Sequence, residues 1–246
     1  MTDLIPADWP APPHVHAYVT TRREGVSNTP YASNNLALHV GDHAQAVQQN
    51  RELLVAALQG CNAIQWLDQV HGTVVNTVKK AGNPLSGDGL QTDVSGLACA
   101  VLTADCLPVF LTDRTGSEVN VVHAGWRGLA AGILACAVQT LRAPPAELLA
   151  WLGPAISQSH FEVATEVAQQ LQMSTSEEQP LVDMPSQATS GKVMVDLYHV
   201  AKCQLQQLGL TEIFGGNFCT YTDIERFYSY RRDGVTGRMA SVIYLT

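Results

Sequence analysis

Short apolar runs separated by turn residues fill the middle of the chain, and this pattern limits the fold more than any other feature of the sequence. The runs combine aliphatic and β-branched residues over lengths typical of strands. They cover residues 64–67, 74–78, 97–103, 109–112 and 119–123, and similar runs lie at 16–21 and 148–152. The sequence therefore predicts that the centre of the protein is a β-sheet.

Helices are predicted between and beyond these runs. The clearest covers 43–59, where apolar residues recur at helical spacing, Asp42 can cap the first turn and Gly60 supplies a stop. Three more helices are predicted at 129–141, 163–173 and 194–208, with loops at 81–93 and 174–191. Residues 226–245 contain a DGVTG turn between β-like arms, which predicts a hairpin.

Strands and helices follow one another without the strict alternation of a doubly wound fold, so we predict an α/β (α+β) architecture with mixed sheets. The 246 residues contain no Pro/Gly/Ser-rich linker, and a single domain over 1–246 is expected. With 46% hydrophobic and 15% charged residues, the chain can bury a large core.

Charge and hydropathy argue against two classes of partner. The formal net charge is −8 and no basic cluster exceeds a pair of arginines, so no binding to nucleic acid is expected. The most apolar stretch, 97–111, is shorter than the roughly 20 residues of a transmembrane helix, so no membrane span is expected. Residues 1–13 do not resemble a secretory signal, and the six cysteines form no C-x-x-C pair. A cytoplasmic protein with reduced thiols is therefore expected.

Three potential metal ligands stand at the ends of predicted strands. His71 comes just before one strand, Cys106 follows another, and His123 ends a third. Side chains at the ends of neighbouring strands meet at one edge of a sheet, and two imidazoles plus a thiolate suit zinc while leaving a fourth position open. From spacing alone, a purely structural role for the three residues is equally possible. The histidines would then be hydrogen-bonded polar groups and the cysteine a small buried residue.

The residues beside these candidate ligands could also have either of two roles. Asp105 is a candidate general base or ligand-orienting group, or else a turn residue. The glycine-containing turn at 124–128 leads into a predicted helix, whose N-terminus would favour an anion, and Arg127 could add charge. The alternative is a tight turn that only allows close packing. Four other arginines could likewise either bind an anion or belong to the solvated surface, namely Arg22, Arg231, Arg232 and Arg238.

Five motifs occur in a characteristic order along the chain. They are QVHG at 69–72, TADCLPV at 103–109, HAGWRGL at 123–129, GPAIS at 153–157 with FEV at 161–163, and CT at 219–220 followed by FYSYRRDGVTGR at 227–238. Together they resemble the YfiH family, also called the multicopper polyphenol oxidase (laccase) or peptidoglycan editing factor family. The resemblance covers nearly the whole chain.

The resemblance implies a four-layered α/β/β/α domain and a zinc ion held by His71, Cys106 and His123. It implies phosphorolysis of adenosine, inosine, guanosine and methylthioadenosine, and hydrolytic deamination of adenosine. The expected partners are therefore small-molecule nucleosides and phosphate. Asp105 joins the three ligands as an expected catalytic residue, and the phosphate is expected to bind arginines, namely Arg22, Arg127 and Arg231.

The chain departs from the family pattern at Ala155 and His160, where many relatives have cysteine, so these positions are not expected to be ligands. A second reading makes Cys106 the nucleophile of an amidohydrolase that acts on a cell-wall (UDP-muramyl) precursor. A third is a copper polyphenol oxidase, although His14 and His16 form the only His-x-His pair that such a site could use. A fourth is a metal-binding protein without turnover.

Overall fold

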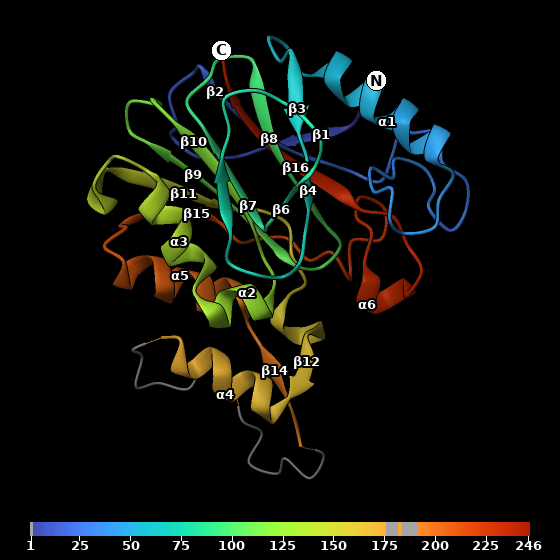
Figure 1. Cartoon of the computed structure of the whole chain (residues 1–246). Helices are drawn as coiled ribbons and strands as arrows, with labels where there is room; N and C mark the ends of the chain where they lie inside the picture. The colour runs from blue at the N-terminus through green and yellow to red at the C-terminus, as the bar shows by residue number, and fades with distance from the viewer. Residues whose placement is uncertain (1, 176–181, 184–190) are drawn as a thin grey trace.

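Two β-sheets packed face to face, with helices on both outer sides, form the body of the molecule (Figure 1). The computed structural model describes residues 2–175, 182–183 and 191–246. In that part of the chain, no helix is long and apolar enough to cross a membrane.

The first sheet has five strands and contains the C-terminal strand near its centre. Its order is β1 (Leu4–Pro6), β2 (Val15–Thr20), β16 (Met239–Leu245), β8 (Leu97–Thr103) and β3 (Ala63–Gln65). Only the β3–β8 pair is parallel, so the sheet is mixed.

The second sheet has six strands and is also mixed. Its order is β15 (Glu212–Gly215), β11 (Leu148–Leu152), β9 (Leu107–Asp113), β10 (Val119–Ala124), β7 (Gly89–Thr92) and β5 (Val75–Thr77). The β11–β15 and β5–β7 pairs are parallel and the others antiparallel. Two small sheets flank it, made of β12 (Glu162–Ala164), β14 (Lys192–Val195) and β13 (Val182–Asp183), and of β4 (Leu67–Asp68) and β6 (Leu85–Ser86).

Alternation of side chains along the strands produces the layers. In β8, Ala98 and Ala100 share a core with α1 (Ala44–Ala57), whereas Cys99 and Val101 share a core with the second sheet. In β9, Phe110 faces the first sheet. The centre of its ring lies 5.3 Å from that of Trp151 in the neighbouring strand β11. The neighbouring residues of β9 face the opposite way, into the core formed with the remaining helices.

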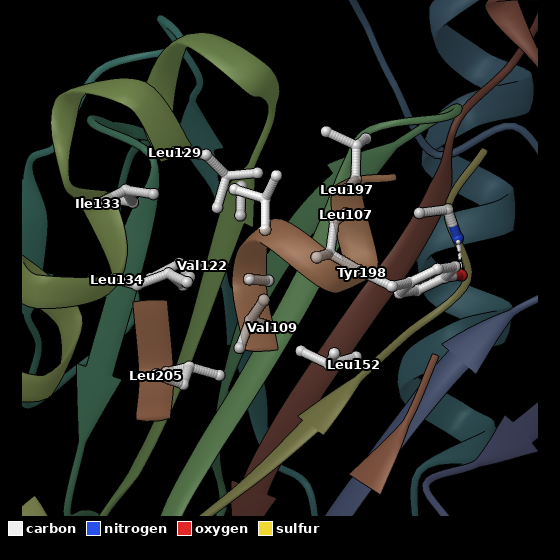
Figure 2. Close-up of a cluster of buried hydrophobic side chains, with 14 of the residues drawn as sticks. Leu107, Val109, Val122, Leu129, Ile133, Leu134, Leu152, Leu197, Tyr198 and Leu205 are labelled. Carbon is white, nitrogen blue, oxygen red and sulfur yellow. Dashed lines mark hydrogen bonds between the residues drawn. The ribbon is translucent and has the colours of Figure 1, made fainter. Parts of the chain in front are cut away.

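Three helices cover the outer face of the second sheet, namely α2 (Trp126–Ala131), α3 (Ile133–Thr140) and α5 (Leu197–Gln207). A fourth, α4 (Thr165–Met173), packs on α2 and on the small sheet of β12 and β14. Figure 2 shows Leu129, Ile133 and Leu134 and, from α5, Leu205 in one buried cluster with Val109 and Val122 of the sheet. The order of layers is therefore helix, sheet, sheet, helix. One further short helix, α6 (Tyr230–Asp233), and two 3₁₀ turns at Pro145–Glu147 and Gln158–His160 complete the described elements.

The predicted α/β class with mixed sheets is confirmed, and the strands at 97–103 and 148–152 have the predicted bounds. The helix predicted at 129–141 is two helices, because Gly132 adopts a left-handed conformation with φ +91° between them. The predicted capping by Asp42 is wrong, since His43 is the N-cap residue and has no side-chain capping bond.

Three other segments also differ from their predictions. The loop predicted at 81–93 contains β6 and β7, and the helices predicted from 163 and 194 begin only after the short strands β12 and β14. The hairpin predicted at 226–245 is wrong, because β16 pairs with β2 and β8 rather than with the residues before the turn. Most of the loop predicted at 174–191 lies outside the described residues, and the part at Val182–Asp183 is a strand.

Candidate metal centre

His71, Cys106 and His123 converge at one end of the second sheet. Their candidate ligand atoms all lie within 4.8 Å of one another. Cys106 directly precedes β9 and His123 lies in the adjacent strand β10, while His71 comes from the loop between β4 and β5. Within the described ranges, this is the only group of three or more His, Cys, Asp or Glu residues with the geometry of a metal site.

One buried carboxylate, Asp88, positions both histidines. Its Oδ1 accepts hydrogen bonds from the backbone N–H of His71 at 2.9 Å and lies 2.8 Å from Nδ1 of His123. Its Oδ2 accepts the N–H groups of Val70 and Gly72. These contacts hold His71 in a left-handed conformation with φ +59°, and they leave Nε2 of His123 for a metal.

The loop that carries His71 is also fixed to the first sheet. The Gln69 side chain donates from Nε2 to the Leu102 carbonyl at 2.9 Å and accepts the Leu102 N–H at 2.7 Å. The amide thus pairs with the backbone of β8 through the same two kinds of hydrogen bond that a neighbouring strand would form. The glutamine of the QVHG segment therefore ties the loop of His71 to the first sheet.

Gly125 leaves room for all three candidate ligands. A Cβ atom at this position would lie 3.1 Å from Sγ of Cys106, 3.2 Å from Cδ2 of His71 and 3.6 Å from Cε1 of His123. Its φ of −66° is ordinary, so close approach rather than backbone conformation requires glycine here. The turn after His123 thus packs directly against the ligand set.

The charges at the centre favour a thiolate. Burial disfavours ionisation of Cys106, but the charges of His123 and His71 and their hydrogen bonds outweigh it and lower the pKa of the thiol to about 6. Burial likewise disfavours the charged ring of His123, whereas Cys106 and Asp88 raise its pKa to about 9. The thiolate is the form of cysteine that binds metal ions.

The centre opens into a cavity of about 340 Å³. Besides the three candidate ligands, its polar lining consists of His39, Gln69, Thr103, Tyr230 and Arg238. The cavity is therefore bounded by residues of both sheets, because Thr103 ends β8 of the first sheet and His123 lies in β10 of the second. Burial and the charge of Arg238 lower the pKa of His39, so its ring is neutral at pH 7.

The arginines singled out from the sequence as phosphate ligands do not line this cavity. The Arg22 guanidinium donates to the carbonyls of Ala32 and Ile224. Arg127 is exposed and stacks on the Trp126 ring at 4.4 Å. The Arg231 side chain donates to the Glu162 carbonyl at 2.8 Å and lies over Phe161.

Asp105 is tied to the segment that follows β15. Its Oδ1 accepts the Thr220 hydroxyl and its Oδ2 accepts the backbone N–H of Arg231, both at 2.7 Å. Its φ of +94° places it in a left-handed turn directly before Cys106. These bonds connect the ligand-bearing turn to residues more than 100 positions away along the chain.

Sequence reasoning missed Asp88, His39 and Tyr230, and it left Arg238 undecided. Asp88 lies in the segment that was predicted to be a loop, and its flanking glycines, Gly87 and Gly89, were the one local signal of an unusual backbone there. No local pattern marks His39. Tyr230 and Arg238 lie in the FYSYRRDGVTGR segment, but that segment does not show that they line the same cavity as the candidate ligands, because the cavity forms only through the packing of the two sheets.

Residues 16–246 match the model of a family described as multi-copper polyphenol oxidoreductase laccase. The chain belongs to this family. Relatives named YfiH are found in Escherichia coli and Shigella flexneri, each 44% identical, with full coverage of both chains. The predicted resemblance to the YfiH family is therefore confirmed.

Other members of the family are equally similar in length and fold. A Pseudomonas aeruginosa protein, PA4543, is 45% identical over all of this chain and 99% of its own, and it is named a purine nucleoside phosphorylase, as are the two YfiH relatives. The crystal structure of Neisseria meningitidis NMB0706 superposes with a TM-score of 0.92 at 42% identity, covering 99% of each chain. That of Bacillus licheniformis YfiH superposes with a TM-score of 0.87 at 32% identity, covering 94% of this chain and 93% of that one.

The donor set fits one transition-metal ion. Two imidazoles and a thiolate lie close together, the carboxylate of Asp88 fixes one ring, and Gly125 keeps the space beside the ligands open. A multicopper cluster would need more histidines at the same place. His14 and His16 instead contact the Gly116 carbonyl and the Thr246 hydroxyl, and no second ligand group occurs in the described part of the chain.

Proposed function

We propose that this protein is a zinc-dependent purine nucleoside phosphorylase that acts on adenosine, inosine, guanosine and methylthioadenosine, and that it also deaminates adenosine. One observation carries the proposal: the His71, Cys106 and His123 centre opens into a cavity large enough for a small ligand. Relatives that match this chain over its full length and carry the name purine nucleoside phosphorylase support it.

Zinc is the metal we propose because two imidazoles and a thiolate with a free fourth position are a common catalytic zinc set. When bound, zinc supplies a Lewis acid that stabilises negative charge on a substrate oxygen. The thiolate form of Cys106 favours a soft or borderline cation. Copper in place of zinc is the alternative that metal analysis of the purified protein tests.

In phosphorolysis, an oxygen of hydrogen phosphate forms a bond to C1′ of the ribose as the bond from C1′ to the purine nitrogen breaks. The purine leaves with that electron pair and takes the proton of the phosphate, giving ribose 1-phosphate and the free base. The transition state has oxocarbenium character, so an anion held against C1′ stabilises it. Tyr230, 60% exposed beside the cavity, offers a ring on which a purine can stack, and the neutral His39 ring can donate a hydrogen bond to it.

A second candidate is the thiol amidohydrolase, which acts on a cell-wall precursor. The lowered pKa of Cys106 beside His123 favours it, because a thiolate next to an imidazolium is also the arrangement of a cysteine nucleophile. The two functions differ in their need for metal, since the nucleophile needs none.

The decisive experiment replaces His71 or His123 by alanine and measures release of hypoxanthine from inosine with and without phosphate. We expect both variants to lose bound zinc and phosphate-dependent activity together, because two remaining ligands hold zinc weakly. The control is His43→Ala, which removes an exposed imidazole that makes no capping bond. Circular dichroism checks the fold. Full activity in metal-free protein would overturn the zinc mechanism and favour the thiol reading.

A further inference from the structure

Arg238 is the only arginine in the lining of the metal cavity. Its Nη1 donates to the carbonyls of Thr236 and Gly237, both at 2.9 Å, and its backbone N–H donates to Oδ1 of Asn35 at 3.0 Å. Its guanidinium also lies 5.7 Å from the centre of the Tyr230 ring. The side chain is therefore held in place at the cavity wall.

The charge of Arg238 has no carboxylate partner in the described part of the chain. Other arginines do, such as Arg226 with Asp223 and Arg232 with Asp233. The nearby carboxylate of Asp105 is already bonded through both oxygens to Thr220 and to the Arg231 backbone. Burial lowers the pKa of Arg238 more than the negative charges of Cys106 and Asp105 raise it. An anion bound in the cavity would offset this cost of burying the cation.

Thr103 adds a second, independent observation. It lines the same cavity, is only 2% exposed, and its hydroxyl has no hydrogen-bond partner among the described residues. In the sheet register Thr103 pairs with Met239, the residue after Arg238. An unsatisfied donor and an unpaired cation thus come from neighbouring strands at the same level of the sheet.

We propose that Arg238 and Thr103 form an oxyanion subsite that binds inorganic phosphate beside the metal triad. The inference rests on the proposed phosphorolysis and names the residues that hold its second substrate. Arginine suits an oxyanion because its N–H groups form charge-assisted hydrogen bonds, and the threonine hydroxyl can donate one more. Because the lowered pKa of His39 leaves its ring neutral, Arg238 is the cation among the lining residues outside the metal triad.

The test measures binding of inorganic phosphate to the zinc-loaded protein by isothermal titration calorimetry. We expect Arg238→Gln to bind phosphate about 10- to 100-fold more weakly, because it loses charge-assisted hydrogen bonds. Arg238→Lys should retain part of the affinity, and Thr103→Val should lose several-fold. The matched control is Arg114→Gln, since Arg114 follows β9 at the end opposite to Cys106 and pairs with Glu212.

Kinetics supply a second readout. In phosphorolysis of inosine, Arg238→Gln should raise the KM for phosphate far more than it changes the KM for inosine, with zinc content unchanged. Should Arg238→Gln fail to fold, the Lys and Val variants carry the test. Phosphate affinity in folded variants within twofold of wild type, or absence of phosphate binding by wild type, overturns the subsite.

The subsite and the proposed function can fail separately. Phosphate binding that depends on Arg238 in a protein without phosphorolysis supports the subsite and contradicts the proposed function. Phosphorolysis that is unaffected in Arg238→Gln leaves the function standing and removes the subsite.

Discussion

At the scale of single residues, the candidate metal centre depends on Asp88, which is not one of the three candidate ligands. The carboxylate is fully buried and accepts hydrogen bonds from three successive backbone N–H groups as well as contacting the ring of His123. It therefore sets both the position of His71 and the free nitrogen of His123.

We predict that Asp88→Asn weakens zinc binding by about 10- to 100-fold, the usual cost of losing an outer partner of a metal ligand. The amide would turn a donor toward N–H groups that need an acceptor. Competition with a chelator at pH 7 measures the affinity. Asp113→Asn is the control, because Asp113 is 3% exposed and binds only its own turn at Thr115 and Ser117. Equal zinc affinity in the two variants would contradict this role of Asp88.

At the scale of elements, a buried side chain of α1 holds the long segment that connects β2 to this helix. Asn50 of α1 is fully buried, and its Oδ1 accepts the N–H of Val26 at 2.9 Å. Its Nδ2 donates to the Ser27 hydroxyl and to the Asn35 carbonyl. Because Asn35 also binds the backbone of Arg238, the helix indirectly supports the cavity wall.

Asn50→Leu should lower the free energy of unfolding by about 2–3 kcal/mol, since it leaves several buried polar groups without partners. Urea denaturation followed by circular dichroism measures the change. Gln49→Leu on the exposed face of the same helix is the comparison and should change stability by less than about 0.5 kcal/mol. A similar midpoint for both variants would show that the segment is held by other contacts.

At the scale of the whole molecule, the candidate centre joins parts of the chain that lie far apart. The ligands come from the second sheet and its loops, Gln69 bonds the loop of His71 to β8 of the first sheet, and β16 brings Arg238 to the same cavity. A metal bound to His71, Cys106 and His123 would link the segments that carry them in the folded state only.

Zinc should therefore stabilise the fold. At a free concentration of about 1,000 times the dissociation constant, binding adds roughly 4 kcal/mol, which corresponds to a rise in Tm of about 8–16 °C for a chain of this size. Differential scanning calorimetry with and without a chelator measures the rise. Cys106→Ala should abolish it, whereas Cys136→Ala, in α3, should keep it. A shift of equal size in both variants would place the stabilising zinc elsewhere.

Local patterns in the sequence determined the strands at 97–103 and 148–152, the helix near 43–59 and the three candidate ligands, because alternation, helical spacing and ligand chemistry are properties of neighbouring residues. The same reasoning failed at 226–245. A turn signal shows that the chain reverses but not which strand it pairs with, and β16 pairs with β2, more than 200 residues earlier.

Only the tertiary structure decided how the site is completed. Asp88 lacks a distinctive local pattern, and the motifs that contain Thr103 and Arg238 do not show that these two residues share a cavity. They reach the centre because two sheets pack face to face and strands distant in sequence pair side by side. The role of a buried carboxylate or of a cation without an ion-pair partner depends on the residues that surround it in the folded protein. The motifs of the sequence therefore supply the candidate ligands, whereas the fold decides how they and the other residues of the candidate site are arranged.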